Sequence, residues 1–147
     1  MSVAVKVQTR IIVTRNDGQE QTFLKTHSFT GLTEVEVREF SIATASTQTV
    51  WDPLAELSEL AGTFAFLAIL SDGNVEAEFI CDDGGEVGKN VWTHRVAQDT
   101  PFVLGGDDSY ANPGADDATS GTLDVIERLR INNVSGATRV VTVILGN

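Results

Sequence analysis

Apolar and polar residues alternate with a period of two along much of this chain, and that pattern predicts strands. The first such segment covers residues 3–13 and includes Val3, Val5 and Val7. The Asn-Asp-Gly sequence at residues 16–18 follows, and it favours a hairpin turn because these residues tolerate a positive φ. We expect the next strand over residues 20–29, so the pattern predicts an N-terminal β-hairpin.

The alternation changes its phase within residues 34–43, which should form the third strand. Val35 and Val37 share one parity, whereas Phe40 and Ile42 share the other. A change of parity within a strand predicts a β-bulge or a bend between sheets. Residues 47–51 continue the β pattern.

One segment carries a helical signal. Leu54, Leu57 and Leu60 follow one another at intervals of three residues. Pro53 suits the first position of a helix, and Asp52 suits its N-cap. We therefore predict a short helix over residues 53–60.

The most apolar segment is FAFLAIL, residues 64–70. A run of this length before a Ser-Asp-Gly-Asn turn predicts a central strand that is buried on both faces. Residues 75–81 alternate again and end at Cys81. Because only four turn residues separate the two segments, we expect them to pair as an antiparallel hairpin.

The C-terminal half continues in the same way, with strands expected at residues 91–97 and 101–104. Residues 105–121 are rich in Gly, Asp, Asn and Ser, and a loop of that length predicts a functional or interface role. Residues 123–131 fit a strand, with a helix as the alternative. Residues 139–145 are apolar on both faces, which predicts either a central strand or a strand covered by another subunit.

Eight to ten such strands joined by turn-rich loops predict an all-β fold, an antiparallel β-sandwich or jelly roll. The 147 residues fit one domain, 1–147. Residues 3–13 show no apolar core of a signal peptide, and no apolar run is long enough to span a membrane. We therefore expect synthesis in the cytoplasm and no contact with membranes.

Charge narrows the range of functions. Ten Lys and Arg stand against 21 Asp and Glu, for a net charge of −11. Binding to nucleic acid is disfavoured, because contacts with phosphates need a basic surface. The acidity suits a basic partner, and solubility alone explains it equally well.

The chain carries none of the common catalytic or cofactor motifs. Its soft metal ligands are His27, His94 and the single cysteine, without the spacing of a zinc site. We expect the Cys81 thiol to be buried and structural. The sequence therefore predicts a protein that is not an enzyme and needs no cofactor.

Paired acids beside glycines leave one ionic possibility open. Asp82, Asp83, Asp107 and Asp108 are calcium candidates, since calcium prefers carboxylate oxygens, but such residues also form ordinary solvated turns. Tyr110 lies in the same long loop as the second pair. Its ring could stack on a sugar or on a partner, or pack on its own domain.

The segments FLAILSDGNVEAEF, VLGGDDSYAN and IERLRINNVSGATRVVTVILGN resemble parts of small virion proteins of tailed bacteriophages. The most similar group is the capsid decoration, or cement, proteins. The resemblance covers residues 51–147 and is one of general character.

The resemblance implies a trimer on the outside of a phage head that bridges capsomers of the major capsid protein. Residues 1–14 would then be the docking strand or arm, by addition to a sheet edge. The interface residues would be Val3, Val5, Val7, Tyr110, Val141, Val143 and Leu145. Two alternatives are a carbohydrate- or receptor-binding module of a fibre or baseplate, and a jelly-roll enzyme in which the two histidines converge with acids.

Overall fold

The computed structural model describes residues 2–52, 64–81, 90–105 and 126–147, and every regular element in these ranges is a β-strand. The chain divides into two compact units, Met1–Glu34 and Val35–Asn147. Each unit is described by itself below. That residues 1–147 form one domain stays a prediction, and the helix expected at residues 53–60 lies outside the described residues.

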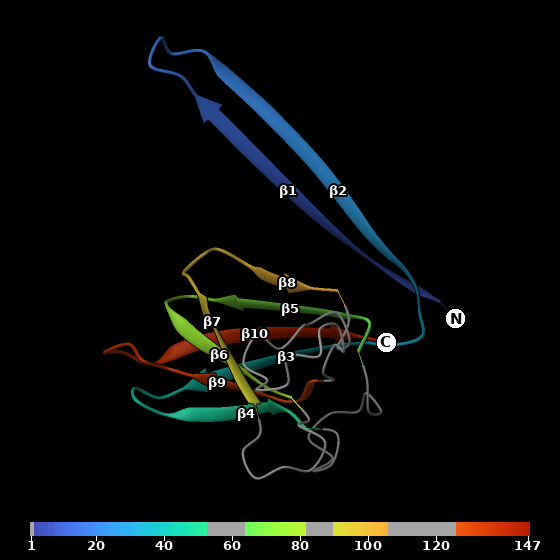
Figure 1. Cartoon of the computed structure of the whole chain (residues 1–147), viewed down its shortest axis with the longest axis vertical. Helices are drawn as coiled ribbons and strands as arrows, with labels where there is room; N and C mark the ends of the chain where they lie inside the picture. The colour runs from blue at the N-terminus through green and yellow to red at the C-terminus, as the bar shows by residue number, and fades with distance from the viewer. Residues whose placement is uncertain (1, 53–63, 82–89, 106–125) are drawn as a thin grey trace, which may run out of the picture. The chain divides into compact units, whose positions relative to one another are not determined.

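The first unit is a long β-hairpin (Figure 1). Strand β1 (Val3–Thr14) pairs antiparallel with β2 (Glu20–Leu32). The turn contains Gly18 at φ 80°, and Asp17 accepts a hydrogen bond from the Gln19 amide at 3.0 Å. The structure thus confirms the hairpin that the Asn-Asp-Gly sequence predicts.

The second unit consists of two four-stranded antiparallel sheets. One has the strand order β3-β10-β5-β8 and the other β4-β9-β6-β7. Their bounds are β3 (Val35–Ile42), β4 (Thr47–Trp51), β5 (Phe66–Ser71), β6 (Val75–Cys81), β7 (Asn90–Val96), β8 (Phe102–Leu104), β9 (Ile126–Asn132) and β10 (Arg139–Gly146). The predicted all-β antiparallel class is confirmed.

Both sheets bury side chains in one shared core. The first sheet contributes Leu67 and Ile69, and the second contributes Trp51, Phe79 and Leu129, all of them essentially inaccessible to solvent. Burial of apolar side chains from two facing sheets is the main stabilising term of such a layered fold. This arrangement is compatible with the expected β-sandwich.

The expected hairpin between residues 64–70 and 75–81 is wrong. Strand β5 pairs with β10 and β8, whereas β6 pairs with β7 and β9, so the turn between β5 and β6 passes from one sheet to the other. The Ser-Asp-Gly-Asn sequence correctly predicts a reversal of the chain. It carries no information on which strands pair after the reversal.

The bulge expected in the third strand is also wrong. Strand β3 pairs with β10 in continuous register from Val35↔Gly146 to Ile42↔Arg139. Val37 is 62% exposed, so the change of parity reflects apolar side chains on the outer face of the sheet. Register shifts occur elsewhere, in the pairing of β1 with β2, of β4 with β9 and of β6 with β9.

Two expectations about later strands hold. Residues 126–132 form strand β9, which excludes the helical alternative over that range. Strand β10 is central, because it pairs with β3 on one side and β5 on the other.

Candidate functional site

The acidic and aromatic loop candidates cannot be placed. Asp82, Asp83, Asp107, Asp108 and Tyr110 lie outside the described residues. Within the described ranges, no three His, Cys, Asp or Glu side chains gather as they would around a metal ion. The calcium and stacking expectations for these five residues stay predictions.

The C-terminal interface candidates need a correction. Val141, Val143 and Leu145 are at most 2% exposed and belong to the core of their own unit. Alternate residues of a strand point to opposite faces, so the residues of β10 that face outward are Val140, Thr142 and Ile144. Sequence alternation located the two faces of this strand but could not tell which one faces the second sheet.

The outer face of the β3-β10-β5-β8 sheet is rich in apolar side chains. Ile144 pairs with Val37 on one side and Ala68 on the other, and Ala68 pairs with Val103. These four residues form a row across all four strands, because paired residues share a face. With Leu70 and Val140, which are 40% and 38% exposed, they define what we call the outer apolar face.

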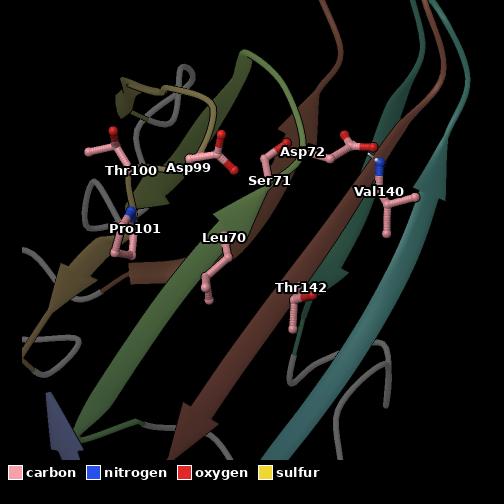
Figure 2. Close-up of a pocket in the computed structure, with 8 residues that line it drawn as sticks. All are labelled: Leu70, Ser71, Asp72, Asp99, Thr100, Pro101, Val140 and Thr142. Carbon is pink, nitrogen blue, oxygen red and sulfur yellow. Dashed lines mark hydrogen bonds between the residues drawn. The ribbon is translucent and has the colours of Figure 1, made fainter.

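A pocket of about 420 Å³ opens beside this face (Figure 2). Two of its lining residues, Leu70 and Thr142, are paired across the neighbouring strands β5 and β10. The other lining residues come from the β5–β6 and β7–β8 turns and from the start of β10: Ser71, Asp72, Asp99, Thr100, Pro101 and Val140.

Hydrogen bonds fix the rim of the pocket. Asp72 accepts a hydrogen bond from the Val140 amide at 3.0 Å and donates its own amide to the Val140 carbonyl at 3.1 Å (Figure 2). The Asp99 amide donates to the Ser71 carbonyl at 3.3 Å, and Asp99 has a positive φ of 56°. The Asp72 carboxylate and the backbone of Asp99 are therefore fixed beside the apolar side chain of Leu70 in the pocket lining.

The hairpin has two chemically different faces. Residues paired across it share a face, so Val5, Val7, Ile11 and Val13 lie on the same side as Phe23 and Phe29. We call these six residues the hairpin apolar face; Lys25 and His27 lie on it as well. The opposite face is mostly polar and carries Lys6 and Arg10 opposite Ser28 and Leu24.

The three N-terminal interface candidates remain accessible. Val3 is 39% exposed, and Val5 and Val7 are half-buried. All three lie in β1, which among the described residues pairs only with β2. The second edge of β1 therefore has unpaired backbone groups that another strand can bond.

The two histidines lie in different units, on β2 and on β7. His94 packs against Phe102 with ring centroids 4.5 Å apart, and Trp92 stacks on Phe79 at the same distance. These rings come from the edge strands β7 and β8 and from β6, and they pack on the core. His94 thus has a packing role. Cys81 is buried, as expected.

The sequence does not predict the structural role of Asn133, whose side chain takes part in five hydrogen bonds. Asn133 is fully buried, and its amide nitrogen donates to the carbonyls of Ile42, Ala43 and Ala137 at 2.9, 3.2 and 2.8 Å. Its side-chain oxygen accepts from the amide and the hydroxyl of Ser135. In the sequence it looked like an ordinary turn residue, since Asn is common in turns.

Two ion pairs attach β9 to its neighbours. Arg128 contacts the buried Asp52 at 2.6 Å, and Arg130 contacts Glu78 at 2.8 Å. The indole nitrogen of Trp51 is buried and finds no hydrogen-bond acceptor within the described part of the chain.

Comparisons with family models, curated proteins and solved structures find no match to this chain. In the ranges that the structure describes, no helix is long and apolar enough to cross a membrane.

Proposed function

We propose that this protein is a non-enzymatic structural component of a tailed-bacteriophage virion, a decoration protein that binds the outside of the capsid and bridges capsomers. The observation that carries the proposal is the strand order of the second unit. Its eight described strands form two sheets in the orders β3-β10-β5-β8 and β4-β9-β6-β7, and every connection except the one from β6 to β7 passes from one sheet to the other. This is the pattern expected of a double-sheet jelly roll, an architecture common in viral capsid domains and lectins.

The hairpin supports the docking part of the proposal. A protein that stabilises a shell must reach a neighbouring subunit, and β1 offers an unpaired edge over Val3–Thr14. Addition of a strand to such an edge provides main-chain hydrogen bonds without a dedicated pocket. The partner at this edge is the major capsid protein, and the protein resides on the capsid surface after synthesis in the host cytoplasm.

The pocket residues support a non-catalytic role. The described lining contains carboxylates and hydroxyls but no imidazole, thiol or amine. The Ser71 hydroxyl is buried and accepts a hydrogen bond from the Gly73 amide at 3.3 Å. The Ser71 hydroxyl therefore holds the β5–β6 turn and is not free to attack a bound molecule.

The proposal is tested by adding the purified full chain to heads of the phage that encodes it and pelleting the heads. We expect saturable binding at a fixed number of copies per capsomer and a higher melting temperature of the heads. Hydrogen exchange of the bound protein should show new protection in β1. Absence of binding to heads, or binding that leaves β1 unprotected, would contradict capsid docking through this edge.

The pocket favours one second function, a carbohydrate-binding module of a fibre or baseplate. The pocket lining combines two carboxylates and the Thr100 hydroxyl with the apolar side chains of Leu70 and Pro101. Sugars are bound by such combinations of hydrogen-bonding groups and apolar surface. A glycan array tests this function, with Asp99→Asn as the variant that should lose binding and Gln48→Ala, exposed on β4 in the other sheet, as the control.

A further inference from the structure

Each unit of the chain exposes several large apolar side chains on one face, among the residues that the structure describes. On the hairpin apolar face, Ile11, Val13 and Phe23 are 45–54% exposed. On the outer apolar face of the second unit, Val37, Leu70, Val103 and Val140 are 36–62% exposed. A two-stranded hairpin alone is at best marginally stable in water, so its apolar face needs a cover. Extended apolar patches of this kind mark interaction sites.

We propose that the hairpin apolar face of one copy of this chain packs on the outer apolar face of a second copy. The contact joins two different surfaces of each copy. We call the hairpin apolar face the donor and the outer apolar face the acceptor. Such head-to-tail contacts generate a closed ring when the rotation between copies closes, and a reciprocal exchange of hairpins between two copies is the smallest closed arrangement. The inference does not depend on the capsid role, because it uses the face of the hairpin and leaves the edge of β1 free.

Charge favours this pairing over the alternatives. Residues 1–34 hold four Lys and Arg against three Asp and Glu, whereas residues 35–147 hold six against eighteen. Two outer apolar faces brought together would join two strongly acidic units. A hairpin on that face joins a slightly basic unit to an acidic one.

The same complementarity appears residue by residue. Lys25 lies on the hairpin apolar face, opposite Thr9 and between the two phenylalanines. On the acceptor side, Glu39 lies on the outer face of β3, while Asp72 and Asp99 line the adjoining pocket. If two hairpin apolar faces packed together instead, Lys25 of one copy would face Lys25 of the other.

The dimensions agree. The 12-residue β1 spans about 40 Å, and the eight-residue β10 spans about 26 Å, at about 3.3 Å per residue. Four strands at about 4.8 Å give a narrower width than either. One hairpin, two strands or about 10 Å wide, can therefore run the full length of the outer apolar face and cover about half of its width. The pocket of about 420 Å³ at its border has room for one aromatic side chain of the hairpin.

The first experiment measures the solution mass of the full chain by light scattering over a range of concentrations. We expect a mass that is a whole multiple of 15.8 kDa and larger than that of one chain. Phe23→Asp should reduce it to the monomer. Leu24→Asp is the matched control, because Leu24 is 65% exposed on the opposite face of the same strand, and it should keep the wild-type mass.

The second pair of variants tests the acceptor. Val37→Asp should also give a monomer. Val91→Asp should not, because Val91 is 49% exposed but belongs to β7, in the other sheet. Circular dichroism and the thermal unfolding midpoint show whether each variant remains folded.

Mixing the two monomeric variants distinguishes the modes of pairing. The hairpin of the Val37→Asp chain is intact, and so is the outer apolar face of the Phe23→Asp chain. The mixture should therefore form a dimer of twice 15.8 kDa and no larger species. Restored association would also show that both variants are folded.

Three results would overturn the inference. A wild-type chain that is monomeric at all concentrations would mean that the hairpin covers its own chain or binds a different protein. An effect of Phe23→Asp without one of Val37→Asp would indicate contact between two hairpins, and the reverse would indicate contact between two sheets. Two folded monomeric variants that fail to associate on mixing would exclude a donor–acceptor contact.

Discussion

At the scale of the residue, Asn133 joins the turn after β3 to the turn before β10. Its amide group satisfies three backbone carbonyls, and its backbone amide donates to the Ser46 carbonyl at 2.9 Å. Asparagine suits this place because it offers donors and an acceptor on one short side chain. A buried carbonyl that loses its donor retains its cost of desolvation.

Asn133→Ala should therefore lower the free energy of unfolding by about 3 kcal/mol, since several buried groups lose their partners. Urea denaturation measures the change. The neighbouring Asn132→Ala is the control, because Asn132 accepts a single exposed hydrogen bond, from Thr47 at 3.3 Å. Equal losses from the two substitutions would contradict the role assigned to Asn133.

Gly73 and Gly136 offer a second matched pair. A Cβ at Gly73 would overlap the Arg139 guanidinium, whereas a Cβ at Gly136 would meet nothing within 4 Å. Gly73→Ala should displace Arg139 and its 2.9 Å hydrogen bond to Ser135, at a cost of about 1 kcal/mol. Gly136→Ala should be neutral within about 0.5 kcal/mol. Thermal unfolding of both variants checks the difference, and similar midpoints would show that Arg139 moves aside freely.

At the scale of the element, the short strand β8 depends on the ring cluster at the edge of the second unit. Its three residues pair only with β5 among the described strands. Phe102 contacts His94 and also Phe79, with ring centroids 4.5 and 5.5 Å apart. The cluster holds β8 against the core more firmly than three residues of pairing could do alone.

Phe102→Ala should cost about 2 kcal/mol, less than for a fully buried phenylalanine because the ring is half-buried. It should also raise the hydrogen-exchange rate of β5 amides next to β8. Val103→Ala in the same strand should cost under about 1 kcal/mol, because Val103 points outward and is 36% exposed. Unchanged exchange in β5 after the Phe102 substitution would show that β8 is held by its backbone alone.

The elements also show how far the sequence could be read. Alternation and turn residues are local signals, so they predict the bounds of the strands at residues 47–51 and 139–145 almost to the residue. The predicted pairing of β5 with β6 is wrong, because the true partners of β5 are β8 and β10, and β10 lies far away in the sequence. Val141 and Val143 were assigned to an interface because a strand apolar on both faces does not reveal which face meets the second sheet.

The candidate surfaces were less predictable than the strands. The outer apolar face exists only when Val37, Ala68, Val103 and Ile144 come together from four strands. The pocket likewise joins two turns that are distant in sequence. The hairpin apolar face can be predicted from the sequence, because the register of its two strands follows from a single tight turn.

At the scale of the whole molecule, the acidic charge is concentrated in residues 35–147. If the hairpin of one copy binds this acidic unit of the next, the contact must weaken with salt, because screening acts on exposed charges. Between 50 and 500 mM NaCl we expect the dissociation constant for self-association to rise about fivefold, roughly 1 kcal/mol. Sedimentation velocity at several salt concentrations measures it, and tighter association in high salt would show that apolar burial alone drives the contact.

The place of β10 between β3 and β5 has a consequence for how the protein is made. The sheet has a gap at its centre until residues 139–146 arrive, so β3 and β5 leave the ribosome without their shared neighbour. Folding of this unit must then wait until residues 139–146 have been synthesised, and pairing over such long sequence separations is slow. During that interval the chain exposes its apolar strands, and this is the stage at which chaperones would matter most.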